Sequence, residues 1–240
     1  MNTYRTVQPH GEINEVFHDL YMVTGTNHIH HDGVDIQVSR NMVIVRDDHQ
    51  LTLINTVRLN EPGLQALDAL GTVQNVVNIG AFHGYDDAFY LDHYHAKLWA
   101  LKNKQHQNNR QADYLLNENG PMPLPDCTLF NFETTQFPEC MLILKRNEGN
   151  VLITCDCIQN WETPDTFFSE QSAKQFQEQG LIKQANIPDT WLGACQPDVA
   201  ELSKIKALSF KHLISAHGVP LKDNAYEKVC ETLKNKFSIS

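Results

Sequence analysis

Three short clusters of histidine and acidic residues each follow a run of strand-forming residues in this chain. Loops at strand ends are where α/β proteins gather their binding and catalytic side chains. Clusters far apart in the sequence are therefore predicted to meet at one pocket, which limits the fold to one that brings these strand ends together. The clusters are His83-Gly84-Tyr85-Asp86-Asp87, Cys155-Asp156-Cys157 and His217-Gly218.

The order of strand and helix signals predicts two strand-rich halves, each followed by helices. Such an order is typical of two sheets packed face to face with helices outside. No linker or repeat divides the chain, so residues 1–240 are expected to form a single domain. The predicted strands are 17–23, 41–45, 51–57, 73–79, 98–101, 127–132, 140–145, 151–155 and 212–216, and the predicted helices are 60–71, 167–180, 197–208 and 224–237.

Composition excludes several classes of partner. The chain has 240 residues, 41% hydrophobic and 20% charged, with a formal net charge of -10 and no basic stripe. A nucleic acid or an anionic membrane surface is therefore not expected as the main partner. The polar first 15 residues, the lack of a long apolar run and six scattered cysteines predict a cytoplasmic protein with reduced thiols.

With the clusters at these places, the chain resembles the metallo-β-lactamase fold superfamily over nearly its whole length. The resemblance implies an α+β fold, a four-layer αββα sandwich of two mixed β-sheets with outer helices. In that superfamily, the strand after the first helix ends in H-x-H-x-D-H. Here His83 and Asp87 keep the motif, whereas Tyr85 and Ala88 replace two of its histidines.

The later positions of the superfamily motif are also partly kept. A further histidine is expected within 134–138, where Gln136 is the nearest polar candidate, while Asp156 matches the bridging aspartate and His217 the last histidine. The resemblance thus implies one metal site with an open coordination position. Its expected ligands are His83, Asp87, Asp156 and His217, and its metal is a single divalent transition ion, Zn, Fe or Mn, or none.

These residues favour a metal-dependent hydrolase of a small-molecule substrate. The expected catalytic residues are Asp87, His83 as a fourth ligand or proton shuttle, and Tyr85, whose phenol would donate to a developing oxyanion. The alternative is a metal-free, inactive member of the superfamily that binds a small molecule or a partner protein. The lost motif histidines support that alternative.

Each residue also has a purely structural explanation. His83 could bond a loop carbonyl, Asp86 and Asp87 could cap the next helix, and His217 could sit in a turn. Whether Asp86, Gln136 or the cluster of His28, His30 and His31 joins the site is left open.

Four further segments have both functional and structural interpretations. The cluster of His28, His30 and His31 before Asp32 is expected in a solvated loop that overhangs the pocket. Residues 92–95 are expected near the site at most. Cys155 and Cys157 are expected to point away from Asp156 into the packing. Trp161 and the stretch 186–191 are expected to form a lid or wall beside the pocket.

Overall fold

The structure is a computed structural model that describes residues 4–31 and 33–239. Its first sheet has seven strands whose order in the sheet is their order in the chain. The first four strands are antiparallel, and β4 to β7 run parallel, because helical segments carry the chain back between them at Glu61–Leu70, Asp87–Tyr94 and Gln107–Asn109. The strands are β1 (Asn14–Phe17), β2 (Leu20–His31), β3 (Val34–Asp47), β4 (Gln50–Ile54), β5 (Thr72–Asn78), β6 (Lys97–Ala100) and β7 (Tyr114–Leu115).

The second sheet has four strands in the order β11-β10-β9-β8. Antiparallel hairpins join β8 to β9 and β9 to β10, and β11 returns parallel to β10 after a helical crossover. Both sheets are therefore mixed. The strands are β8 (Cys127–Asn131), β9 (Cys140–Leu144), β10 (Val151–Thr154) and β11 (His212–Ser215).

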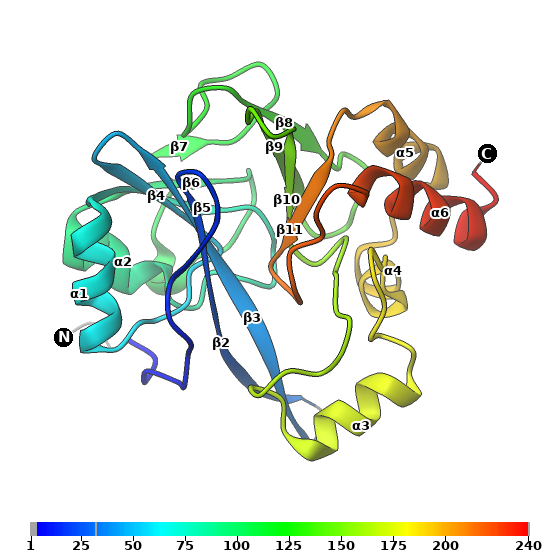
Figure 1. The fold of residues 1–240 in the computed structure, drawn as a ribbon, viewed down its shortest axis with the longest axis horizontal. Coiled ribbons are helices and arrows are strands. Elements are labelled where there is room, and N and C mark those ends of the chain that lie inside the picture. Colours follow the sequence, from blue (N-terminus) through cyan, green and yellow to red (C-terminus); the bar gives the residue numbers. More distant parts are fainter. Residues whose placement is uncertain (1–3, 32, 240) are drawn as a thin grey trace.

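The helices lie outside the two sheets (Figure 1). The α1 helix begins where the sequence predicts, because the Asn60 side chain accepts a hydrogen bond from the Gly63 N–H at 2.9 Å and Pro62 occupies the first turn. The helices are α1 (Glu61–Leu70), α2 (Asp87–Tyr94), α3 (Glu170–Glu178), α4 (Asp189–Cys195), α5 (Val199–Ser203) and α6 (Ala225–Phe237), with 3₁₀ turns η1 (Gln107–Asn109) and η2 (Lys204–Ala207).

Three apolar clusters fill the spaces between these layers. One lies between the sheets and includes Ile54, Val77 and Ile153. A second packs the four-stranded sheet against the C-terminal helices, and the third packs the seven-stranded sheet against α1 and α2. The chain is an α+β sandwich of two mixed sheets with outer helices, as the sequence predicts.

The long β2–β3 hairpin differs from the prediction. Strand pairing continues without a break from Leu20 opposite Val45 to His31 opposite Val34. His28 and His30 are therefore on a strand near the hairpin tip, and the prediction of a loop there is wrong. Unbroken cross-strand pairing outweighs the polar composition of this stretch. Asp32 lies outside the described residues.

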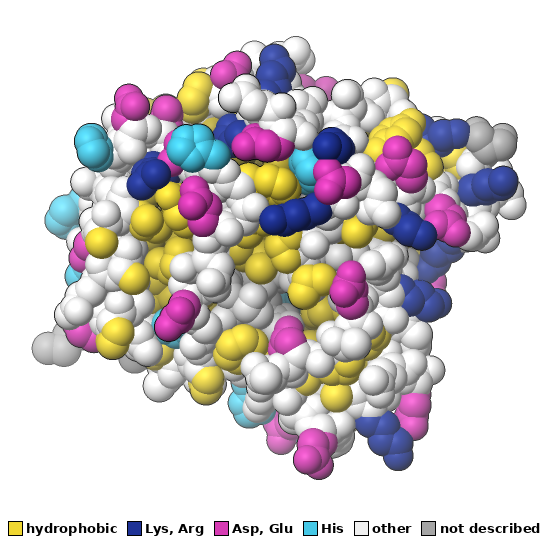
Figure 2. All heavy atoms as spheres, viewed as in Figure 1, with side chains coloured by type: hydrophobic (Ala, Val, Ile, Leu, Met, Phe, Trp, Pro, Cys, Tyr) yellow, Lys and Arg dark blue, Asp and Glu magenta, His cyan; other side chains and the backbone are white. Residues whose placement is uncertain are grey.

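The surface matches the charge pattern of the sequence. On the face shown in Figure 2, acidic and basic side chains are interspersed and do not gather by sign. Within residues 4–31 and 33–239, no helix is both long enough and apolar enough to cross a bilayer.

Candidate metal centre

Three of the predicted ligands converge at one edge of the sandwich. The Nε2 atoms of His83 and His217 are 3.2 Å apart, and Oδ1 of Asp156 lies 3.1 Å from the His217 Nε2 and 3.6 Å from the His83 Nε2. These side chains follow β5, β11 and β10, so three strand ends supply one cluster. Both histidines are buried, and the Asp156 side chain is 14% exposed. The atoms that bind metals thus meet in a largely water-excluded place.

A glycine after each histidine allows this approach. Gly84 has φ +97°, and a Cβ there would lie 2.1 Å from Nδ2 of Asn78. Gly218 has φ +91°, and a Cβ there would lie 2.0 Å from the carbonyl oxygen of Asn160. Glycine is the residue that adopts such backbone angles without strain and leaves room for the neighbouring chain. The His-Gly pairs in the sequence are therefore a requirement of the local backbone.

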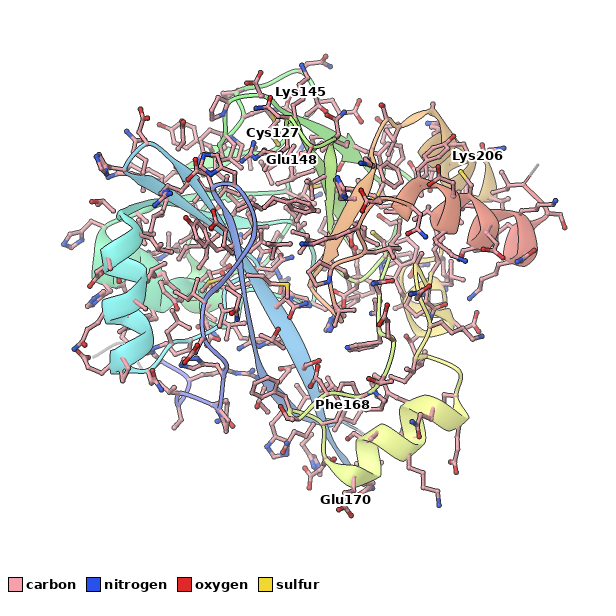
Figure 3. The ribbon with its side chains drawn as sticks, viewed as in Figure 1. Cys127, Lys145, Glu148, Phe168, Glu170 and Lys206 are labelled. Carbon is pink, nitrogen blue, oxygen red and sulfur yellow. The ribbon has the colours of Figure 1, made fainter. Side chains whose placement is uncertain are left out.

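The orientation of His217 is fixed from two sides. Its Nδ1 is 3.1 Å from the carbonyl oxygen of Ser39, so Nδ1 carries a proton and donates it. Trp161 packs against the imidazole with ring centroids 5.1 Å apart, and the indole N–H donates to Oγ of Ser39. Phe168 leads into α3 (Figure 3). Its ring packs edge-on against that of Trp161. Trp161 therefore forms a wall of the site.

The cluster places one carboxylate beside two imidazoles in a buried setting. Burial lowers the pKa of His83, which favours the neutral imidazole. Burial alone would raise the pKa of Asp156, but the charges and hydrogen bonds of His83 and His217 hold it well below its usual range. Because His217 donates from Nδ1, its Nε2 faces Oδ1 of Asp156 at 3.1 Å, where either a proton or a metal ion can lie between the two atoms.

The spacing of the cluster fits a metal ion. Ligand atoms about 2.0–2.1 Å from a tetrahedral zinc lie about 3.3–3.4 Å from one another. The three distances here, 3.1, 3.2 and 3.6 Å, bracket that value. Two imidazoles and one carboxylate leave a coordination position open, as in hydrolytic zinc sites and non-haem iron sites. The donor set therefore fits a single transition metal.

Cys155 belongs to the same cluster, contrary to the prediction from strand alternation. His83, Cys155 and Asp156 each offer a ligand atom, and these atoms lie within 4.8 Å of one another. The Cys155 Sγ is 3.4 Å from Oδ2 of Asp156. The prediction was wrong because β10 ends at Thr154, so alternation no longer sets the side-chain directions. Burial raises the pKa of Cys155 well above its usual value, so without a cation it is a thiol.

Asp87 has different neighbours. Its Oδ1 accepts a hydrogen bond from Oγ1 of Thr56 at 2.6 Å, and its Oδ2 accepts one from Nδ2 of Asn78 at 2.9 Å. Both oxygens are therefore engaged by buried donors from the ends of β4 and β5. These bonds hold the loop that carries His83, and a ligand role for Asp87 stays a prediction.

The other candidate residues are placed as follows. Asp86 makes no side-chain cap for α2, and its carboxylate instead forms a buried ion pair with Arg40. Gln136 is exposed and donates from Nε2 to Oε1 of Gln196. The ring of Tyr85 lies 3.9 Å beneath the guanidinium of Arg5.

The histidines near the hairpin tip pair with one acid. The exposed side chains of His28 and His30 lie on the same face of β2 opposite Asp35, at 3.7 and 2.9 Å. A cross-strand carboxylate therefore explains the H-x-H spacing. His31 has no described side chain.

Sequence reasoning missed Glu139, which is buried directly before β9. Its carboxylate accepts hydrogen bonds from the Cys157 N–H at 2.6 Å and the Trp191 indole N–H at 2.8 Å. Burial and the nearby charge of Asp156 raise the pKa of Glu139 to about 8. A lone glutamate at a strand start gives no sequence signal, since its partners lie 18 and 52 residues away.

Sequence reasoning also missed Lys104, which is partly buried behind the loop that carries His83 and donates to the carbonyl oxygens of Ala81 and His83. Its position depends on a long polar excursion whose path the sequence does not indicate.

Comparisons with known proteins agree with this architecture. The structure is similar to DIM-1 metallo-β-lactamase exposed to ceftazidime, with a TM-score of 0.61, 14% identity, and coverage of 96% of this chain and 99% of that one. It is similar to the mono-zinc form of the metallo-β-lactamase FIM-1 from Pseudomonas aeruginosa, with a TM-score of 0.59, 13% identity, and coverage of 95% and 96%. VMB-1 gives a TM-score of 0.64 at 10% identity, with coverage of 93% and 96%.

No family model and no curated protein matches the sequence. The structural neighbours nevertheless align over nearly their full length, and the two sheets with outer helices follow the same plan. The chain therefore has the metallo-β-lactamase fold, as the resemblance of its strand-end clusters predicts.

Proposed function

We propose that this chain is a metal-dependent hydrolase that uses one divalent transition metal held by His83, Asp156 and His217. The observation that carries the proposal is the convergence of three acceptor atoms, from three strand ends, at the spacing of metal ligands. Two imidazoles and one carboxylate suit zinc or ferrous iron better than the oxygen-rich sites of magnesium or calcium. The neighbours described as metallo-β-lactamases, one in a mono-zinc form, support the hydrolase class.

A bound metal of this kind would supply Lewis-acid polarisation of a carbonyl or phosphoryl oxygen and lower the pKa of water. The chain's own residues prepare the site for it. Asp156 stays ionised, and Ser39 fixes the His217 tautomer that presents a lone pair at Nε2. Trp161 covers one side and excludes water, which strengthens electrostatic interactions within the site.

The catalytic roles of the remaining residues extend the proposal. His83, whose lowered pKa favours the neutral imidazole, would bind the metal through the Nε2 that faces the cluster. A role for the Tyr85 phenol as a donor to an oxyanion stays a prediction, because its ring packs against the guanidinium of Arg5. Asp87 would hold this loop in place through its bonds to Thr56 and Asn78.

Hydrolysis assays on metal-free and metal-loaded protein test the proposal. Protein dialysed against a chelator would be assayed with ceftazidime, a thioester and an activated phosphodiester, before and after addition of one equivalent of Zn(II) or Fe(II). We expect turnover of at least one class after metal addition, and its loss in His217→Ala but not in the surface variant His18→Ala. Turnover that is insensitive to chelation would contradict the proposal. Metal uptake without turnover of any class would favour the alternative, a binding protein.

A further inference from the structure

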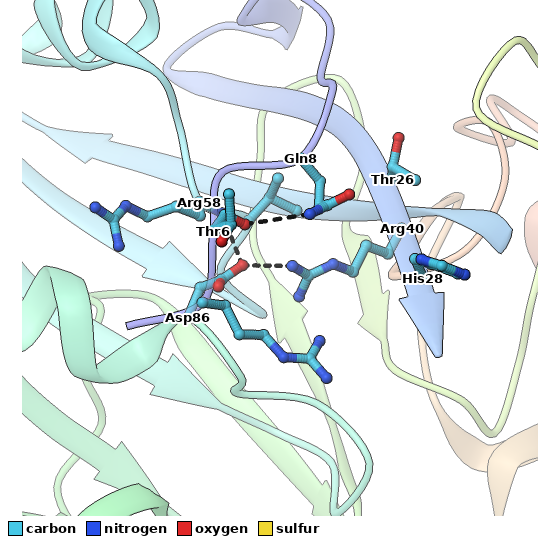
Figure 4. A pocket seen from close by; sticks show the side chains of 9 residues that line it. Thr6, Gln8, Thr26, His28, Arg40, Arg58 and Asp86 are labelled. Atoms are coloured by element: carbon cyan, nitrogen blue, oxygen red, sulfur yellow. Dashed lines mark hydrogen bonds and ion pairs between the residues drawn. The ribbon is translucent and has the colours of Figure 1, made fainter. Parts of the chain in front are cut away.

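A polar cavity lies beside the loop that carries His83, and Asp86 of that loop lines it. It has a volume of about 200 Å³. The N-terminal segment covers it, held along β2 by hydrogen bonds from the Gly11 N–H to the Thr24 carbonyl and from the Thr26 N–H to the Pro9 carbonyl. Loops after β4 and β5 close the other side. Its lining residues are Arg5, Thr6, Gln8, Thr26, His28, Arg40, Val57, Arg58 and Asp86 (Figure 4).

The charge of this cavity is opposite to that of the whole chain. Three of the chain's six arginines line it, along with one histidine and one acid, Asp86. The chain as a whole carries a formal net charge of -10. Even if His28 is not counted, the three arginines and Asp86 give the lining a net charge of +2. Like charges gathered in a cavity repel one another, so their presence indicates a compensating anion.

Arg40 is the most deeply placed of the three cations. Its side chain is 5% exposed and extends from β3 toward Asp86 (Figure 4). One Nη donates to the carboxylate of Asp86 and the other to the Thr56 carbonyl at 3.1 Å. Its Nε is buried and has no hydrogen-bond partner among the described residues. A buried guanidinium N–H without a partner is costly, so the hydrogen-bonding groups of Arg40 are only partly satisfied by Asp86 and Thr56.

Asp86 does not neutralise the other two arginines. Its Oδ2 accepts both the Arg40 guanidinium and the Arg58 backbone N–H at 2.8 Å. Within the described part of the chain, the Arg58 guanidinium lies over the Phe89 ring and that of Arg5 over the Tyr85 ring, and neither is seen in an ion pair. Burial lowers the pKa of Arg58, and the nearby charge of Asp86 offsets this effect only in part.

We propose that this cavity binds an oxyanion group, phosphate or carboxylate, through Arg40, Arg58 and Arg5. Guanidinium groups match the planar faces of both anions with paired N–H donors. The cavity exceeds the size of either ion alone, so it has room for part of an organic molecule that bears one. The proposal does not depend on the metal centre, although Asp86 and His83 share a loop.

Anion titrations test the site directly. Calorimetric titrations of chelator-treated protein with inorganic phosphate, phenyl phosphate and acetate, at constant ionic strength, would be compared with the same titrations of variants. We expect saturable binding of phosphate or acetate with one equivalent. Arg5→Met and Arg58→Met should each weaken it by about tenfold or more. Arg46→Met, which removes the same charge at the far end of β3, should change it less than about twofold.

Arg40→Lys provides the variant for the buried position, since it keeps a charge opposite Asp86 and loses the guanidinium fork. It should also weaken anion binding, with thermal melts confirming that each variant is folded. If phenyl phosphate binds more tightly than phosphate, the natural ligand is an organic molecule that bears the anion. If the two bind equally, the ligand is the free ion. Both results support the proposal. No saturable binding of any of the three anions, or equal effects of Arg58→Met and Arg46→Met, would overturn it.

Discussion

The Nε2 atoms of His83 and His217 face each other at 3.2 Å across 134 residues of sequence. No feature of either local segment requires this contact. It follows from the topology, because β5 of one sheet leads into the loop that carries His83 and β11 of the other sheet leads directly to His217. With Asp156 beside them, these atoms define the proposed metal centre.

The two His-Gly pairs should be intolerant of a side chain. Gly218→Ala places a Cβ 2.0 Å from the Asn160 carbonyl oxygen at φ +91°. Gly33→Ala is the matched control, since Gly33 has φ +79° and open space around it. The control should lose about 1–2 kcal/mol of unfolding free energy from backbone strain alone, and Gly218→Ala at least about 2 kcal/mol more. Urea unfolding measures both, and equal losses would contradict the packing described here.

The Asp87 network should contribute to stability. Thr56→Val keeps the side-chain shape and removes the hydroxyl that donates to Oδ1 of Asp87 at 2.6 Å. The buried carboxylate then loses a partner, at an expected cost of about 1–3 kcal/mol of unfolding free energy. Thr128→Val, at an exposed position of β8, should change stability by less than about 0.5 kcal/mol. A Thr56→Val protein as stable as the control would show that this bond has no structural role.

The ion pair of Arg40 and Asp86 should behave as a buried one. Its side chains are 5% and 2% exposed, whereas those of Arg46 and Asp19 are each 30% exposed. Arg40→Met leaves a buried carboxylate unpaired and should cost about 3–5 kcal/mol. Arg46→Met should cost less than about 1 kcal/mol. Denaturant unfolding of the two variants tests this, and similar losses would mean that the Arg40 pair is hydrated.

Glu139 should make stability depend on pH. Burial and the Asp156 charge raise its pKa from 4.5 to about 8 in the folded protein, so the folded state binds this proton more tightly than the unfolded state. Its contribution to stability is full below pH 4.5 and is lost as the pH rises toward 8. Between pH 4.5 and 8 the free energy of unfolding of the wild type should therefore fall as the pH rises. Glu139→Gln should reduce this fall by up to about 1 kcal/mol per pH unit. Unfolding of chelator-treated protein between pH 5 and 8 measures the difference, with Glu148→Gln as an exposed control; parallel curves for wild type and Glu139→Gln would contradict it.

Much of the fold could be predicted because its signals are local. The apolar runs of β5, β10 and β11 and the Asn60 cap of α1 are visible in the sequence. The ends of those strands led to His83, Asp156 and His217. The Glu139 carboxylate, the Cys155 thiol and the Arg40–Asp86 pair could not be predicted, because each depends on the packing of segments distant in sequence.

Metal stoichiometry tests the central claim most directly. Equilibrium dialysis of chelator-treated protein against Zn(II) or Fe(II), followed by elemental analysis, should give one equivalent for the wild type and for His18→Ala, whose side chain is 79% exposed. Asp156→Ala and His217→Ala should retain well under about a tenth of that amount at the same free metal concentration. Wild-type protein that binds neither metal, or variants that bind one equivalent as tightly as wild type, would contradict a metal centre at His83, Asp156 and His217.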